Sequence, residues 1–116
     1  MGLPNLKISA TAVRVPVFNG HAESVLAEFE NKLTADECRE IYKGSAGITL
    51  IDDVSKLQYP TQVFMDNKDP VAVGRIRNDP SCDNGIAFWC VADNIRKGAA
   101  TNAVQIAEEM IRMKLL

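Results

Sequence analysis

The chain has few of the residue types on which metal sites and disulfide frameworks depend. Its 116 residues include one histidine, one tryptophan and three cysteines. Cys38, Cys82 and Cys90 form no C-x-x-C pair, and the only histidine, His21, lies far from all three in the sequence. Neither a zinc site nor a disulfide framework is therefore expected. We expect no metal site, and three free thiols in a reducing compartment.

The chain also lacks a dominant charge and a long apolar run. Thirteen basic residues oppose fifteen acidic ones, which leaves a net charge of −2, and Lys and Arg do not cluster. The basic surface of a nucleic-acid-binding protein is therefore missing. No apolar run approaches the roughly 20 residues of a membrane helix, and no signal-peptide pattern is present. We expect a cytoplasmic protein with one domain over residues 1–116, which binds neither nucleic acid nor a membrane.

Hydrophobic periodicity predicts an α+β fold. Residues 7–17 alternate as a strand does, and Arg14 continues the face of Ile8, Ala10 and Ala12. Residues 22–30 have both helical composition and strand alternation; we predict a strand, because propensity is the weaker argument in a packed domain. Further strands are predicted over residues 47–51, 71–77 and 86–92, and helices over residues 35–43 and 96–114. These elements suggest a mixed or antiparallel sheet with helices packed on one face, and a long C-terminal helix.

Local signals mark several of the boundaries. Thr34 and Glu37 form a capping box that starts a helix, which should end near Gly44. The Asn84-Gly85 step suits a turn with positive φ before the last strand. The first helix should bury Cys38, Ile41 and Tyr42. The last helix has a wide apolar face made by Ala100, Ala103, Val104, Ala107, Met110 and Ile111.

Two residues invite a functional interpretation on chemistry alone. Arg14 carries a permanently charged guanidinium, whose parallel N–H donors can bind a carboxylate or a phosphate. His21 is the only imidazole and hence the only ordinary proton shuttle near neutral pH. The alternative is that Arg14 pairs with an acidic neighbour and His21 is a turn residue. Arg75 and Arg77 share one strand face, where a solvated edge is the simpler interpretation than an anion site.

Three long strings resemble one family, the bacterial aspartate-semialdehyde dehydrogenases. They are KISATAVRVPVFNGHAES (residues 7–24), DPVAVGRIRNDPS (69–81) and FWCVADNIRKGAATNAVQIAE (88–108), in the family's order. The resemblance covers nearly the whole chain and implies the C-terminal, dimerisation part of the enzyme, with the fold of the C-terminal domain of glyceraldehyde-3-phosphate dehydrogenase-like proteins. That family reduces aspartyl phosphate to aspartate semialdehyde with NADPH, through a cysteine thioester, in the pathway to lysine, threonine and methionine.

The resemblance implies a role for three residues. Arg14 would bind the substrate carboxylate, His21 would accept and donate the proton, and Asn94 would lie against the nicotinamide end of NADP. The family's nucleotide-binding half and its nucleophilic cysteine have no counterpart in this sequence. NADP would therefore be bound mainly by that missing half. The resemblance also implies a homo-oligomer, with aspartyl phosphate, aspartate semialdehyde and phosphate as small-molecule partners.

Three interpretations remain open at this stage. The chain is part of a dehydrogenase and inactive by itself, or a standalone interaction module, or one half of a split enzyme whose other half is a separate chain.

Overall fold

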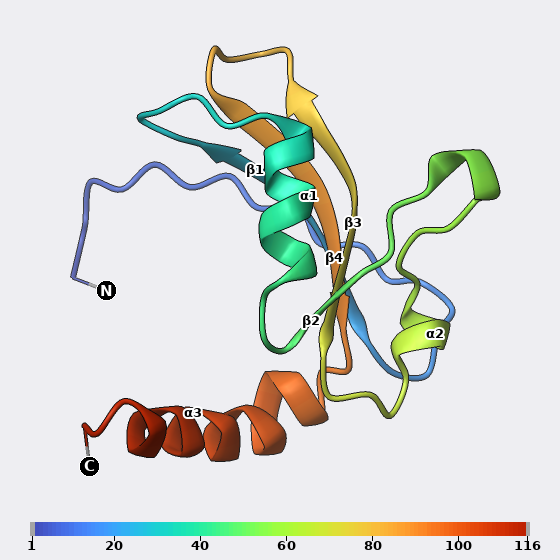
Figure 1. The fold of residues 1–116 in the computed structure, drawn as a ribbon, viewed down its shortest axis with the longest axis vertical. Helices are drawn as coiled ribbons and strands as arrows, with labels where there is room; N and C mark the ends of the chain where they lie inside the picture. The colour runs from blue at the N-terminus through green and yellow to red at the C-terminus, as the bar shows by residue number, and fades with distance from the viewer. Residues whose placement is uncertain (1, 116) are drawn as a thin grey trace.

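A four-stranded mixed sheet organises the computed structural model, which describes residues 2–115 (Figure 1). The elements in chain order are β1 (His21–Glu28), α1 (Ala35–Lys43), β2 (Ile48–Leu50), a 3-10 turn (Val54–Lys56), α2 (Gln62–Met65), β3 (Val71–Asp79), β4 (Gly85–Ala92), a π-helical turn (Arg96–Ala100) and α3 (Thr101–Arg112). The strand order is β1-β4-β3-β2; β4 is antiparallel to both its neighbours, and β2 is parallel to β3. The predicted α+β class, mixed sheet and long closing helix are confirmed.

The edge strand β1 resolves the ambiguity of residues 22–30 in favour of a strand. It pairs with β4 without interruption, from His21 opposite Ala92 to Glu28 opposite Gly85. The backbone hydrogen bonds of this ladder and its contact with a buried strand outweigh the helical propensity of its alanine, leucine and glutamate side chains. β2 is shorter than predicted, and its residues are half-buried.

Both faces of the sheet carry a small apolar cluster. The face under α1 buries Cys38 of the helix against three strand residues, Val73, Ile76 and Ile86. The opposite face buries Met65 of α2 with Ala72 and Val91. α1 therefore packs on one face of the sheet, as predicted. The short α2 packs on the opposite face, where the sequence predicts no helix.

The start of α1 follows its sequence signal closely. The Glu37 N–H donates to the Thr34 hydroxyl, and the Thr34 N–H donates to the Glu37 carboxylate at 2.8 Å. This second bond is the main reason why the pKa of Glu37 lies below its usual value. The prediction that Ile41 is buried is wrong, since its side chain is 57% exposed. α1 packs on β2 and β3, and through Cys38 and Tyr42 also on β4; these contacts do not cover Ile41.

Residues 7–17 do not form the predicted strand. The backbone from residue 2 to residue 20 carries no strand, and Ile8 and Val13 are each about three-quarters exposed. The alternation of the segment is that of a strand, but a strand also needs a neighbour that takes its backbone hydrogen bonds. Within residues 2–115 no strand takes that place.

The turn into β4 differs from its prediction as well. Neither Asn84 nor Gly85 has a positive φ. Gly85 is required for another reason: a Cβ there would lie 2.2 Å from the Cys82 Sγ and 2.8 Å from the Asp79 Cβ. The glycine therefore permits the close approach of the preceding loop, which is its second common use after left-handed turns.

A buried carboxylate holds a β-bulge in β3. The register of β3 against β4 shifts between Gly74 and Arg77, and Arg75 has a φ of 55°. Asp52 accepts the Arg75 N–H at 2.6 Å and the Ile76 N–H at 3.3 Å. Its other partner is Arg39 of α1, whose Nε lies 2.8 Å from Oδ2. The Asp52 side chain is 1% exposed, so these bonds replace all the water that the carboxylate gives up on folding.

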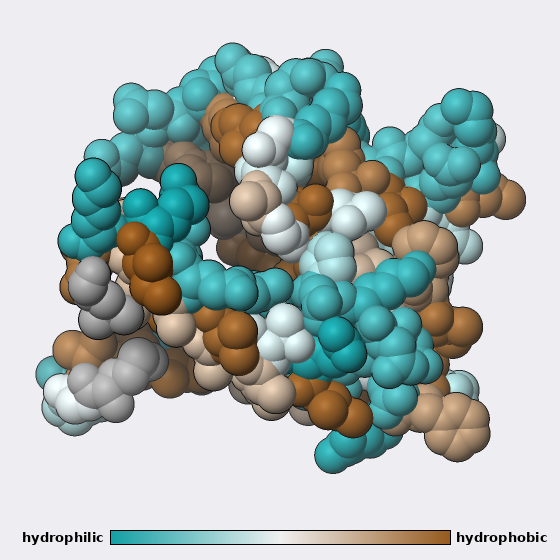
Figure 2. Space-filling model, turned by 60° about the horizontal axis from the view of Figure 1, so that its bottom comes forward, coloured by the Kyte–Doolittle hydropathy of each residue, from teal (hydrophilic) through white to brown (hydrophobic). Residues whose placement is uncertain are grey.

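The closing helix α3 stands apart from the sheet and exposes its apolar side chains (Figure 1). The exposed fractions are 59% for Val104, 54% for Ile106 and 64% for Ile111. Figure 2, in which the lower side of Figure 1 comes forward, shows hydrophobic side chains between the polar ones on this side of the molecule. Within the described chain, the wide apolar face predicted for this helix has little to pack against.

We expect Asp52→Ala to lower the free energy of unfolding by about 3 kcal/mol, because it leaves the N–H groups of Arg75 and Ile76 and the Arg39 guanidinium without their shared acceptor. Asp36→Ala is the matched control. It removes the other carboxylate bound to Arg39, which is 94% exposed, and should cost less than about 1 kcal/mol. Urea unfolding followed by the fluorescence of Trp89 measures both. Equal losses in the two variants would contradict the central role of Asp52.

Candidate active site

His21 is the first residue of the edge strand β1, and its side chain is exposed. Its backbone position is set by the ladder pair with Ala92. Gly20, just before it, has a φ of 95°, which favours glycine. A Cβ at Gly20 would lie 2.9 Å from the Cβ of Gln62. α2 therefore lies directly against the turn that leads into His21.

Two side chains from distant parts of the sequence hold this turn. The Gly20 N–H donates to the Asn94 Oδ1 at 2.7 Å, and the Asn19 Nδ2 donates to the Asp66 Oδ1 at 2.9 Å. The structure thus brings two of the three predicted site residues, His21 and Asn94, to one place. The contact of Asp66 with this turn could not be predicted from the sequence. No local pattern marks an aspartate that accepts a hydrogen bond from a residue 47 positions earlier.

Asp93 anchors the junction between β4 and the C-terminal helix. It is 2% exposed, and its carboxylate accepts the N–H groups of Ile95, Arg96 and Asn67 at 2.8, 3.0 and 2.9 Å. These backbone hydrogen bonds, that from Arg96 first, hold the pKa of Asp93 below its usual value. An aspartate just before a helix is a recognised capping signal, so this residue could have been found from the sequence.

A second carboxylate stabilises the first turn of this junction. The Asp69 Oδ1 lies 2.7 Å from the Arg96 Nε and accepts the Thr101 hydroxyl at 3.3 Å. The bond to Arg96 is the main cause that lowers the pKa of Asp69. The helix begins with a π-helical turn, in which the Ala100 N–H donates to the Ile95 carbonyl. Such turns often occur near functional sites.

Arg14, the third predicted site residue, lies in the exposed segment ahead of the turn. Within residues 2–115 its guanidinium forms no ion pair and no hydrogen bond, and it does not contact His21 through either. The structure therefore leaves Arg14 without the acidic neighbour considered in the alternative interpretation.

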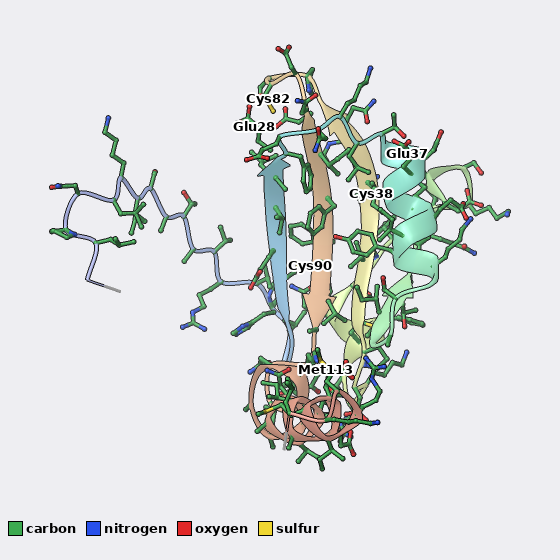
Figure 3. All side chains as sticks on the ribbon, turned by 60° about the vertical axis from the view of Figure 1, so that its left-hand side comes forward. Glu28, Glu37, Cys38, Cys82, Cys90 and Met113 are labelled. Atoms are coloured by element: carbon green, nitrogen blue, oxygen red, sulfur yellow. The ribbon has the colours of Figure 1, made fainter. Side chains whose placement is uncertain are left out.

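The three cysteines occupy separate places (Figure 3). Cys38 lies on α1, Cys90 in the middle of β4, and Cys82 in the loop between β3 and β4. Burial is the main cause that raises the pKa of each thiol above its usual value. A raised pKa disfavours the thiolate, which is the reactive form.

A pocket of about 580 Å³ opens on the sheet face that carries Trp89. Arg75 and Arg77 line it together with Tyr59, Gln62 and Trp89. Both arginines are exposed. The Arg77 Nη1 donates to the Arg75 carbonyl at 3.0 Å, and the exposure of both side chains agrees with the solvated edge expected from the sequence.

Among residues 2–115, no group of three or more His, Cys, Asp or Glu side chains could hold a metal ion. None of the helices described is long and apolar enough to cross a membrane.

The mixed sheet, its covering helix and the polar junction at the end of β4 define an α+β domain of the kind found in the C-terminal part of dehydrogenases. Residues 1–97 match the family described as semialdehyde dehydrogenase, dimerisation domain. The chain belongs to this family, and the resemblance found in its sequence is confirmed.

Relatives and solved structures agree with this assignment. An aspartate-semialdehyde dehydrogenase of Aquifex aeolicus is 48% identical over 97% of this chain and 33% of its own length. One of Legionella pneumophila is 50% identical, with the same two shares. The crystal structure of aspartate semialdehyde dehydrogenase II from Vibrio cholerae superposes with a TM-score of 0.76 at 50% identity, over 85% of this chain and 29% of that one. The chain thus spans about a third of the length of the curated relatives it matches.

We expect the stability of the fold to fall in acid, in part through Asp93. Its pKa lies below 3.8 in the folded protein, so its contribution is present above about pH 4 and is lost as the pH falls through the lowered folded value. Thermal unfolding midpoints measured from about pH 5 to about pH 2 should therefore drop more steeply for the wild-type chain than for Asp93→Asn. Asp83→Asn, at an exposed position, is the control and should keep the wild-type slope. Parallel curves for wild type and Asp93→Asn would contradict this role.

Proposed function

We propose that this chain is the catalytic and dimerisation part of an NADP-dependent aspartate-semialdehyde dehydrogenase of the cytoplasm, formed as one domain over residues 1–116. The reaction converts L-aspartyl phosphate, NADPH and a proton into L-aspartate 4-semialdehyde, phosphate and NADP. The observation that carries the proposal is the 48% identity over 97% of the chain with a relative of that name. The clustering of His21 and Asn94 at one end of the sheet supports it.

His21 is assigned the proton transfers of the reaction. Its imidazole is exposed on a backbone that a ladder pair and the Asn94 bond to Gly20 hold in place, which suits a group that must reach a bound substrate. The nucleophilic thiol of the family is assigned to the part outside this chain. Cys38, Cys82 and Cys90 are not candidates, because burial raises the pKa of each.

We assign to Arg14 the binding of the substrate carboxylate. A guanidinium donates two parallel hydrogen bonds to a carboxylate, which orients the substrate as well as binding it. Arg14 is exposed and has no acidic partner within the described chain, so its donors are available. A carboxylate substrate would supply the missing partner.

Asn94 is assigned to the nicotinamide end of the cofactor. Its Oδ1 accepts the Gly20 N–H, which leaves the Nδ2 as a free donor of the kind that a carboxamide oxygen requires. When bound, NADPH supplies the two electrons of the reduction. The chain offers no glycine-rich nucleotide loop, so the remaining contacts are assigned to the part of the enzyme outside it.

A second function, self-association, is favoured by the exposed apolar face of α3. Monomeric proteins rarely expose continuous apolar surface of this kind. The family name refers to dimerisation, and we propose that the chain forms homo-oligomers.

Kinetics should separate the roles of Arg14 and His21. The assay uses a complete enzyme in which this chain replaces the matching third of the Aquifex aeolicus relative. Arg14→Leu should raise KM and lower kcat/KM by the equivalent of about 2–5 kcal/mol. Arg14→Lys should restore little of this loss, because an ammonium cannot donate two parallel hydrogen bonds to the carboxylate. His21→Asn should lower kcat about 10²–10⁴-fold with little change in KM.

Two controls accompany this assay. Arg112→Leu, which removes an exposed arginine of α3, should leave both constants unchanged. The 116-residue chain alone should show no turnover. Near-normal kcat in His21→Asn together with an unchanged KM in Arg14→Leu would refute the assigned roles.

Association should depend on the apolar face of α3. We expect Ile111→Lys to weaken self-association at least about tenfold, because burying an unpaired ammonium costs more than the lost apolar contact. Glu108→Lys, which places the same ammonium group on the opposite, polar face and changes the net charge by +2 instead of +1, should have little effect. Light scattering across a concentration series measures both. A wild-type chain that stays monomeric at high concentration would count against this function.

A further inference from the structure

The position of His21 depends on contacts outside its own strand. β1 is an edge strand, so His21 has a ladder partner on one side only. Residues 2–18, which precede the turn, form no strand and are mostly exposed. The first residue of such a strand frays easily unless another contact holds it. The hydrogen bonds of Asn19 and Gly20 are the contacts that tie this point to the rest of the molecule.

We propose that Asp66 is a positioning residue for His21, acting through Asn19. The proposal rests on the proton-transfer function proposed for His21. The Asn19 amide nitrogen donates to the Asp66 carboxylate at 2.9 Å, and both side chains are half-buried. A hydrogen bond to a carboxylate is roughly twice as strong as one between neutral groups, so this bond restrains the turn two residues before the imidazole.

Asp66 is itself fixed in place by its neighbours on both sides. Met65 is 1% exposed and packs in the core with Ala72 and Val91. The Asn67 N–H donates to the buried carboxylate of Asp93 at 2.9 Å. The Asp66 backbone therefore links the core and the β4 junction, and its side chain is a rigid point from which to hold the turn.

Asn94 and Asp66 act on the turn from two sides. Asn94 accepts the N–H of Gly20, and Asp66 accepts the side chain of Asn19, one residue earlier. Asn94 is also assigned to the cofactor, so a change there would alter two functions. Asp66 has no such second assignment and isolates the positioning effect.

The first experiment uses the full 116-residue chain, labelled with ¹⁵N. Asp66→Ala should raise the exchange rate of the Gly20 amide at least about tenfold and lower the order parameter of the His21 amide. Asp66→Asn keeps an oxygen acceptor for Asn19 and should restore most of the protection. Asp83→Ala, an exposed aspartate in the loop at the other end of β4, should behave as wild type, and the amides of β4 should stay protected in all variants. Unchanged exchange at Gly20 in Asp66→Ala would overturn the proposal.

The second experiment measures kinetics in the complete chimeric enzyme described above. Asp66→Ala should lower kcat about tenfold with KM for the substrate little changed, since small displacements of a catalytic group are costly. Asp66→Asn should recover kcat. Asn19→Ala should match Asp66→Ala, and the double variant should be no worse than either single one, because both remove the same bond.

The outcomes separate the two proposals. If His21→Asn lowers kcat and Asp66→Ala does not, the positioning role is wrong and the proposed function stands. If His21→Asn keeps normal kcat, the catalytic assignment fails, and with it the positioning of a catalytic group, whatever the exchange rates show.

Discussion

Two consecutive side chains at the end of β4 join the parts of the molecule that the sheet alone does not connect. The carboxylate of Asp93 accepts N–H groups from the start of the last helix and from Asn67, after α2. The amide of Asn94 accepts the N–H of Gly20, before β1. One chain segment thus fixes the direction of α3, the end of α2 and the beginning of the edge strand.

The buried carboxylates share a common physical logic. Asp93 at one end of the sheet and Asp52 beside the β3 bulge each accept backbone N–H groups that no ladder or helix satisfies. A buried N–H without an acceptor is costly, so irregular backbone needs such a side chain close by. Asp52 also binds Arg39 of α1 and so ties a helix to the bulge, whereas Asp93 ties two helices to a strand. The irregular backbone at the β3 bulge and at the end of β4 is therefore tied to other elements by the hydrogen bonds of these two carboxylates.

Elements that carry their own stabilising signal were predictable from sequence. The box formed by Thr34 and Glu37 set the start of α1, and Gly44 set its end. The two segments on either side of the turn at residues 78–85 predicted β3 and β4 as paired strands. Contacts between distant segments were not predictable, since nothing in the sequence near Asp66 indicates that Asn19 donates to it. At Gly85 the sequence predicts the right residue for another reason. The Asn84-Gly85 step suggests a turn with positive φ, but the structure requires a glycine because Cys82 approaches closely.

The chemistry of His21 and Arg14 singled them out but left the ordinary alternatives open, and their roles came from a resemblance. The structure adds a framework for His21 that no periodicity contained, namely the turn held by Asn94 and Asp66. For Arg14 it adds exposure and the lack of an acidic partner within residues 2–115. Contacts within the chain thus bring His21 and Asn94 together, whereas Arg14 has no such contact within residues 2–115, and the roles of all three residues stay predictions.

Two segments have a correct periodicity without the contact that the periodicity serves. Residues 7–17 alternate as a strand and have no ladder partner, and α3 has a wide apolar face that is largely exposed within the described chain. Alternation of this kind is useful only when one face is buried, and an apolar helix face only when it packs. Because the chain spans about a third of its curated relatives, both patterns fit the proposed function, in which these faces would contact the remaining part of the enzyme or a second copy. Arg14 lies within one of these two segments. Under that proposal, the contact that orders residues 7–17 would also set the position of the Arg14 guanidinium.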